Sequence, residues 1–171
     1  MKLTNEQKEF YYGNKELADD VVSTNVVEHG QIVYGARAVN AQLPPHLQKH
    51  TEDWDIYSKK PHSDAVETEK ELDESYGGDF FYVKPAKHVG TYKVKSKVTQ
   101  DTIADYTQKR GKVPTINSLG VSYTTLSFSK KKFKQSLKNK ENRFRWVKDN
   151  EVLQRIGLAE RRWNFGGRWG W

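Results

Sequence analysis

The stretch that most constrains the fold lies at residues 50–58 and reads HTEDWDIYS. Trp54 and Ile56 have high strand propensity, and side chains two positions apart in a strand point to the same face. Asp53 and Asp55 are therefore predicted side by side on one face, with Trp54 and Ile56 on the other. Adjacent like charges are unfavourable unless a cation, water or a partner compensates them. The stretch predicts a charged site, with a solvent-exposed acidic pair as the alternative.

Length and composition favour one domain, with room for a short appendage. The chain has 171 residues, of which 35% are hydrophobic and 30% charged, and aromatic residues at 12% supply large buried areas. The absence of cysteine excludes disulfides and thiolate metal sites. We find no apolar run of about 18 residues and no secretory signal at the N-terminus. We therefore expect an intracellular, soluble (cytoplasmic) protein with no membrane segment, and a virus particle is an alternative location.

The net charge of +7 is distributed unevenly along the chain. Residues 1–110 carry 15 Lys and Arg against 18 Asp and Glu, whereas residues 111–171 carry 14 against 4. Such asymmetry favours an anionic partner, with nucleic acid as the first candidate. A solvated, lysine-rich surface is the alternative explanation.

Periodicity and turn residues predict a mixed α/β layout. A helix is expected over residues 14–29, and a short strand at 31–34 leads through Gly35 into a helix that stops at Pro44-Pro45. Ser63 is expected to cap a helix that ends at Gly77. The other expected elements are strands at 52–58, 79–84, 91–98 and 102–107, a loop at 108–117 and a helical region at 131–158. We divide the chain into a core at 1–128 and a basic, aromatic-rich helical region at 129–171 that packs on it.

Glycine and a third acid complete a pattern around the two aspartates. The sequence Tyr34-Gly35-Ala36 ends a strand and opens a helix, and a glycine there lets backbone N–H groups approach a phosphate. Asp105 lies in the later β-rich run TIADYT, and its strand-like neighbours make it a better candidate than the nearby Asp101. Three carboxylates on neighbouring strands could hold one or two Mg²⁺ ions, which prefer oxygen ligands and bridge phosphates. A plain turn glycine and a surface aspartate are the alternatives for Gly35 and Asp105.

These residues resemble the nucleotidyltransferase (DNA polymerase β-like) superfamily, in particular its minimal and abortive-infection-type members. The resemblance is carried by IVYGARAVNAQL…TEDWDIYS and by the later segment RFRWVKDNEVLQRIGL. It implies a nucleotidyltransferase-like α/β (α+β) fold, a mixed sheet flanked by helices with a basic helical C-terminal region. The family's turn is usually Gly-Gly or Gly-Ser, and Ala36 lacks the serine hydroxyl and the freedom of a second glycine.

The resemblance also implies roles for individual residues. Asp53, Asp55 and Asp105 would form the catalytic and Mg²⁺-binding group, with Asp105 helping to activate the acceptor. The backbone N–H groups of Gly35 and Ala36, with Arg37, would bind the triphosphate of an NTP.

Basic and aromatic side chains are interleaved at residues 129–146. Cations that neutralise phosphates and rings that stack are typical of a nucleic-acid surface. An amphipathic helix with a buried aromatic face and solvated lysines is the alternative, and the two are compatible. The candidate nucleic-acid-binding residues are Lys130, Lys131, Lys132, Lys134, Lys138, Lys140, Arg143 and Arg145. The tryptophan-rich end RRWNFGGRWGW is expected to pack on the core or on a partner in a larger assembly.

Together, these features lead us to expect a Mg²⁺-dependent transferase that moves an NMP from an NTP to an acceptor hydroxyl. The alternative is a catalytically inactive protein of the same fold that binds nucleic acid or serves as an assembly component of a virus particle or ribonucleoprotein. A metal-dependent nuclease that uses the same acids is a third hypothesis. The chain has no GxSxG, GxxxxGK[ST] or GxGxxG motif and its histidines are scattered, which argues against serine hydrolase, P-loop, Rossmann and histidine-metal sites.

Overall fold

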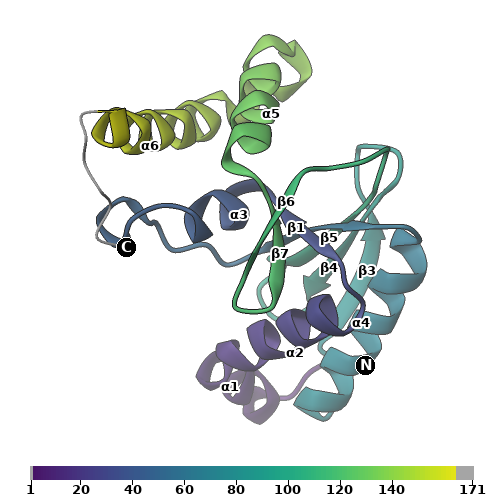
Figure 1. Ribbon diagram of the computed structural model, residues 1–171. Coiled ribbons are helices and arrows are strands. Elements are labelled where there is room, and N and C mark those ends of the chain that lie inside the picture. Colours follow the sequence, from purple (N-terminus) through teal and green to yellow (C-terminus); the bar gives the residue numbers. More distant parts are fainter. Residues whose placement is uncertain (1, 165–171) are drawn as a thin grey trace.

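The computed structural model describes residues 2–164 and combines helices with a single mixed sheet (Figure 1). The α-helices are α1 (Asn5–Gly13), α2 (Lys15–Glu28), α3 (Gly35–Ala41), α4 (Pro61–Tyr76), α5 (Leu126–Lys138) and α6 (Trp146–Asn164). Two 3-10 turns are η1 (Pro45–Leu47) and η2 (Lys140–Arg145). Within residues 2–164, every helix is too short or too polar to serve as a bilayer-crossing segment.

Seven strands form the sheet, in the spatial order β3-β4-β5-β2-β1-β7-β6. Their bounds are β1 (Ile32–Tyr34), β2 (Trp54–Ser58), β3 (Phe81–Pro85), β4 (Thr91–Ser96), β5 (Thr102–Gln108), β6 (Thr115–Ser118) and β7 (Val121–Thr124). β2 runs parallel to β5 and antiparallel to β1, and β1 runs parallel to β7. The expected mixed α/β architecture is confirmed.

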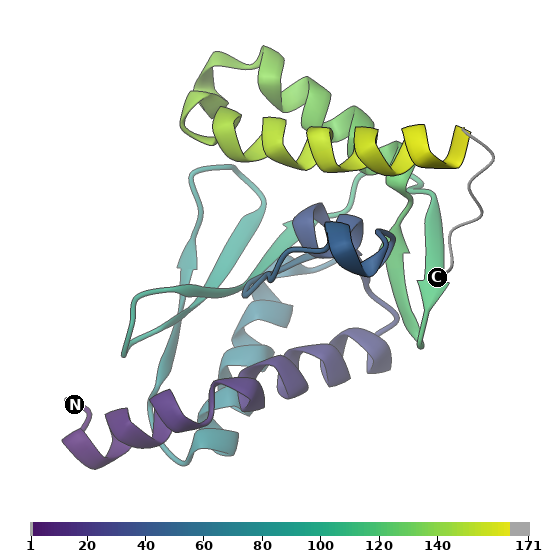
Figure 2. The same ribbon diagram turned by 90° about the vertical axis from the view of Figure 1, so that its left-hand side faces the viewer.

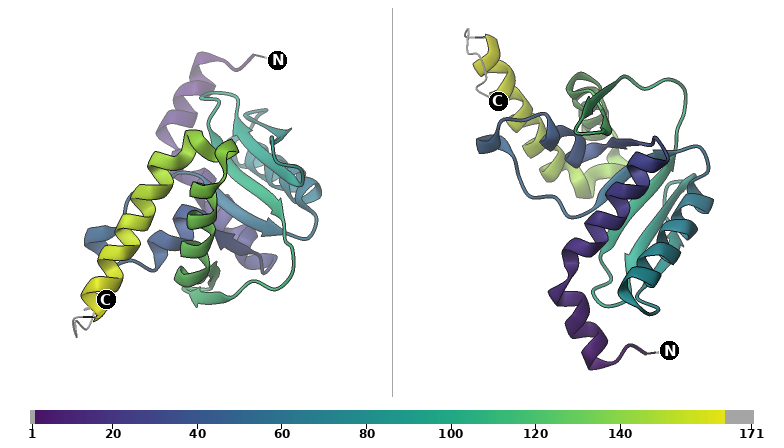
Figure 3. Two further views of the ribbon diagram at one scale, coloured as in Figure 1. Left: turned by 90° about the horizontal axis from the view of Figure 1, so that it is seen from above. Right: turned by 60° about the horizontal axis from the view of Figure 1, so that its bottom comes forward.

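Helices α2 and α4 cover one face of this sheet (Figure 3). Val22 and Val26 of α2 and Leu72 of α4 are fully buried against strand residues such as Ile56 and Tyr106. Because side chains alternate along a strand, the covered face takes every second residue and leaves the others to the opposite face. The opposite face is therefore where polar strand residues collect.

A second core joins the C-terminal helices to α3. Val39 of α3, Phe133 of α5 and Ile156 of α6 pack together. α5 and α6 lie side by side on the side of the molecule away from α1 and α2 (Figure 2). Helices α5 and α6 thus contact α3 through a small apolar cluster of their own.

The segment at residues 108–117, expected to be a loop, contains the start of an additional hairpin. β6 pairs with β7, and β7 extends the sheet beside β1. Gly111 and Pro114 do lie in an irregular segment before β6. Because they are turn residues, the sequence predicts a loop that extends over the start of the strand. β6 is an edge strand with mostly exposed side chains, so it lacks the apolar alternation that marks a half-buried strand.

Helix ends also differ from the expectation. The region at 131–158 is two helices separated by η2, whose Asn139 side chain accepts the N–H of Glu141. The cap of α4 is Lys60 rather than Ser63, because Pro61 takes the first helical position, where its missing N–H costs nothing. The N-terminal helix α1 was not expected and begins at a capping box made by Thr4 and Gln7.

Candidate active site

Strand β2 places its acid on the uncovered face of the sheet. Trp54, Ile56 and Ser58 are buried on the covered face, so Asp55 and Tyr57 point the other way. In the parallel pairing of β2 with β5, Asp55 lies directly opposite Asp105. Asp53 immediately precedes the strand, and its side chain is directed to the same site.

The three predicted acids meet. One carboxylate oxygen from each of Asp53, Asp55 and Asp105 lies within 4.8 Å of the other two, and we call this group the acid cluster. Asp53 is exposed, whereas Asp55 and Asp105 are half-buried. Asp101, the alternative third acid, is exposed at the residue before β5 and does not belong to the cluster.

Burial and the neighbouring carboxylates dominate the electrostatics of Asp55. Burial, followed by the nearby carboxylates of Asp105 and Asp53, raises the pKa of the Asp55 carboxyl well above its usual range. Arg145 acts in the opposite direction but does not outweigh these causes. Asp55 therefore favours its protonated form, or a cation that would hold the ionised form.

Gly35 is positioned at the acid cluster by a contact that no other residue type could make. Its φ is +75°, and a Cβ placed on it would lie 2.5 Å from Oδ2 of Asp55. Both the left-handed backbone and the space require glycine here. Gly35 and Ala36, the first two residues of α3, therefore bring their backbone next to Asp55.

Arg37 points toward the segment that carries Asp53. Its Nη2 donates hydrogen bonds to the carbonyl oxygens of Thr51 and Glu52, at 3.0 and 3.2 Å. Its Nε donates to the carbonyl oxygen of Asp53 at 3.3 Å, and the guanidinium stacks on the ring of Trp54 at 3.9 Å. Arg37 thus binds the segment that leads into β2 and holds Asp53 in place.

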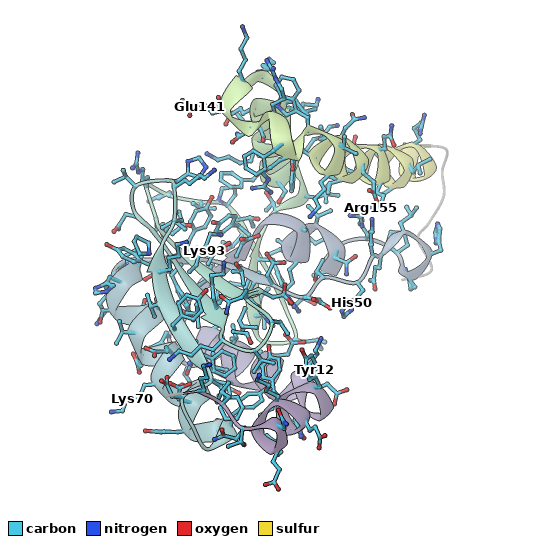
Figure 4. All side chains as sticks on the ribbon, turned by 180° about the vertical axis from the view of Figure 1, so that it is seen from behind. Tyr12, His50, Lys70, Lys93, Glu141 and Arg155 are labelled. Atoms are coloured by element: carbon cyan, nitrogen blue, oxygen red, sulfur yellow. The ribbon has the colours of Figure 1, made fainter. Side chains whose placement is uncertain are left out.

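Lys93 is a neighbour of the acid cluster that the sequence did not single out. Its Nζ donates to Oδ1 of Asp105 at 3.0 Å, and β4 pairs with β5 so that Lys93 lies directly opposite Asp105. Figure 4 shows Lys93 on the strands near the centre of the molecule, below the segment that carries Glu141. The alternation TYKVKSKV put Lys93 on the polar face of a strand, and only the register of β4 with β5 could have paired it with Asp105.

The candidate nucleic-acid-binding residues lie on α5 and η2 and make different contacts. Lys130 pairs with Glu160 at 2.7 Å, and Arg145 pairs with Asp149 at 3.6 Å. Lys132 and Arg143 lie over the rings of Phe128 and Trp146, and Lys140 begins η2. Lys131, Lys134 and Lys138 line, with Lys130, a surface groove of about 470 Å³ on α5, which we call the lysine groove. The end of the tail, residues 165–171, lies outside the described part of the chain.

The fold is similar to that of a polyadenylate synthase of known structure. The crystal structure of the Megavirus polyadenylate synthase matches 88% of this chain with a TM-score of 0.73 and 21% sequence identity. The match covers 32% of the synthase, so this chain spans about a third of its length. No protein-family model and no curated protein sequence matches the chain. The structural match confirms the expected resemblance at the level of the fold: the chain has a nucleotidyltransferase-like fold.

Proposed function

We propose that this protein is a nucleotidyltransferase that moves a nucleoside monophosphate from an NTP to an acceptor hydroxyl. The observation that supports this best is the meeting of the three acids within 4.8 Å beside the Gly35 turn. The pattern consists of a glycine turn into a helix, one acid just before the next strand, one acid on that strand and a third acid on the neighbouring strand. This pattern occurs in a fold that is similar to that of a polyadenylate synthase.

The acid cluster fits a magnesium ion. Its donors are carboxylate oxygens, the ligands that Mg²⁺ takes in proteins, and burial with two neighbouring carboxylates raises the pKa of Asp55. We propose that Asp53, Asp55 and Asp105 hold the metal. When bound, Mg²⁺ would supply positive charge that offsets the charge of the triphosphate and of the departing pyrophosphate.

The chain's own groups orient the reactants. The backbone N–H groups of Gly35 and Ala36 donate to triphosphate oxygens, which the missing side chain of Gly35 makes approachable. Arg37 fixes the segment that carries Asp53, and a direct contact of Arg37 with the triphosphate stays a prediction. Lys93 holds one oxygen of Asp105 and so fixes the rotamer of that carboxylate.

Transfer follows from this arrangement. The acceptor oxygen forms a bond to the α-phosphorus while the bond from that phosphorus to the bridging oxygen breaks, and pyrophosphate leaves with the bonding electrons. The hydroxyl proton passes to the carboxylate of Asp105. The basic residues of α5 and η2 would bind a nucleic-acid acceptor through its phosphates.

A specific contact favours the second candidate, an inactive protein of this fold that binds nucleic acid. Lys93 Nζ lies 3.0 Å from Asp105 and already supplies a positive charge at the acid cluster. Ala36, where the family usually has Gly or Ser, also suits a protein that no longer binds a triphosphate. In that case the basic segment would act without the acid cluster.

Labelled-nucleotide transfer separates the two candidates. The protein is incubated with each α-phosphate-labelled NTP, Mg²⁺ and single-stranded RNA, and the products are sized. A transferase lengthens the acceptor and loses this activity in D53N and D55N, while the matched control D101N, an exposed acid outside the acid cluster, retains it. Salt-sensitive RNA binding without transfer, unchanged in D53N and D55N, would support the inactive protein, and a shortened RNA would indicate a nuclease.

A further inference from the structure

A cavity of about 320 Å³ opens on the same face of the sheet as the acid cluster. Its floor is formed by Tyr34, Tyr57 and Thr107, from three adjacent strands. Tyr57 follows Asp55 by two residues and Thr107 follows Asp105 by two, so each shares a face with the acid before it. On β2 and β5 these lining residues lie about 7 Å along the strands from the acids, and Tyr34 of β1 lies directly opposite Asp55.

The walls of the cavity are cationic. Arg110 and Lys112, from the segment after β5, and Lys132, from α5, line it, and no Asp or Glu is among its lining residues in the described chain. All three cations are exposed, and none of them forms an ion pair with a carboxylate of residues 2–164. An uncompensated group of three cations around one cavity favours an anionic ligand.

The same cavity also offers ring surfaces and hydroxyl groups. The rings of Tyr34 and Tyr57 stack at 4.1 Å, and Phe128 of α5 contributes a third ring to the lining. Tyr34, Thr107 and Thr91 form a chain of hydroxyl hydrogen bonds of 2.7 and 3.0 Å. Aromatic faces beside cations are the combination that binds a nucleotide, because rings stack on the base and cations neutralise the phosphate. The volume suits one nucleotide and is too small for a duplex.

The position of the cavity indicates which nucleotide it takes. In the pairing of β1 with β2, Tyr34 lies opposite Asp55 and Ile32 opposite Tyr57, so the step from Asp55 to Tyr57 leads away from Gly35. Along β2, Asp55 thus lies between the Gly35 turn and the part of the cavity that Tyr57 lines. In phosphoryl transfer the attacking and leaving oxygens lie on opposite sides of the phosphorus. With the leaving pyrophosphate at the Gly35 turn, the attacking hydroxyl comes from the cavity.

We propose that this cavity binds the terminal nucleotide of a single-stranded nucleic acid and that this strand is the acceptor. The inference rests on the proposed nucleotidyl transfer and adds the class of acceptor and its binding residues. Lys132 lies on α5 three residues before Gln135, which also lines the lysine groove, and residues three or four apart are neighbours on a helix. The lysine groove would bind the phosphates of the strand further from its end.

Binding of a labelled single-stranded oligonucleotide tests the proposal. Fluorescence anisotropy is measured for the wild type, the double variant R110A/K112A, F128L and the control K70A/K84A, which removes two exposed lysines from α4 and β3. Each lost phosphate contact reduces the slope of log affinity against log salt by about 0.7, so R110A/K112A should lower it by about 1.4 and weaken binding about tenfold or more. F128L should weaken binding with an unchanged salt slope. K70A/K84A should bind like the wild type.

Two further measurements separate this proposal from the proposed transfer. In the transfer assay, R110A/K112A should raise the KM for the oligonucleotide and leave the KM for the NTP unchanged. The proposal is overturned if R110A/K112A binds the oligonucleotide like the wild type, or if it weakens NTP binding instead, which would make the cavity the site of the NTP base. If the cavity proposal is overturned in this way while D53N and D55N still abolish transfer, the proposed transfer reaction is supported and only the acceptor site is refuted. If no NTP is transferred but oligonucleotide binding depends on Arg110 and Lys112, the cavity is a binding site for the strand and the proposed transfer reaction is refuted.

Discussion

Replacing Asp55 with asparagine should stabilise the metal-free protein. The carboxylate oxygens of Asp55 and Asp105 lie within 4.8 Å, and two unit charges at that distance repel by about 3.5 kcal/mol at an effective dielectric constant of 20. Asparagine keeps the shape of the side chain and removes the charge. Because Lys93 already offsets part of the charge of Asp105, we expect D55N to raise the free energy of unfolding by about 1–3 kcal/mol. For a chain of this length this corresponds to roughly 2–10 °C in Tm.

Thermal unfolding in EDTA and in Mg²⁺ measures the effect. The wild type should unfold at a lower temperature than D55N in EDTA and should gain stability with Mg²⁺, because a ligand that binds only the folded state stabilises it. D55N should respond weakly to Mg²⁺, and D101N should match the wild type in both conditions. A D55N protein that is less stable than the wild type in EDTA would refute the reasoning that the acid cluster is short of positive charge.

The pH dependence gives an independent check with a defined sign. The pKa of Asp55 is raised in the folded protein by burial and by Asp105 and Asp53, so its ionisation opposes folding. The protonated carboxyl of Asp55 therefore contributes to stability. This contribution is complete below the pKa of the unfolded state, about 3.9, and is lost as the pH rises through the pKa of the folded state. The difference in Tm between D55N and the wild type in EDTA should therefore shrink as the pH falls from 7.5 toward 5. A difference that stays constant over this range would assign the effect of D55N to something other than charge.

Three other substitutions test the surroundings of the acid cluster. G35A should lower the free energy of unfolding by at least about 1–2 kcal/mol, because φ is +75° and the new Cβ meets Asp55, and denaturant unfolding measures this loss. K93M should lower the Tm in EDTA and enlarge the stabilisation by Mg²⁺, since it removes the cation bound to Asp105; an unchanged response to Mg²⁺ would contradict this role. R37A should weaken Mg²⁺ binding, measured by calorimetry, and destabilise the fold by about 1–3 kcal/mol, because Arg37 holds three backbone carbonyls before β2 and stacks on Trp54; full retention of Mg²⁺ affinity would show that the segment does not need Arg37.

The sequence predicted the acid cluster because its signal is local. A strand with apolar Trp54 and Ile56 determines where Asp55 points, and the neighbours of Asp105 distinguished it from Asp101. Only the pairing of β2 with β5, which sequence spacing does not define, brings the two acids opposite each other. The cavity was missed for the same reason, because its lining comes from segments far apart in the chain.

The prediction of secondary structure from the sequence was wrong where local signals compete. The expected loop before β6 has real turn residues, and the polar sequence TINS carries no alternation that would mark an edge strand. The sequence predicts one helical region at 131–158, whereas η2 separates α5 from α6. The break depends on the side chain of Asn139, which accepts a backbone N–H at 3.0 Å and so caps a new turn.

The pairing of Lys93 with Asp105 bears directly on whether the acid cluster holds a metal. Three carboxylates and one ammonium group leave a formal charge of −2 at the site, and a divalent cation neutralises that charge. Without Lys93, a single Mg²⁺ ion would leave one carboxylate unneutralised beside a half-buried Asp55. Arg145 cannot take this role in the same way, because half of its side chain is exposed and it pairs with Asp149. Lys93 is therefore compatible with one bound divalent ion and with an inactive site, and the Mg²⁺ response of the wild type decides between them.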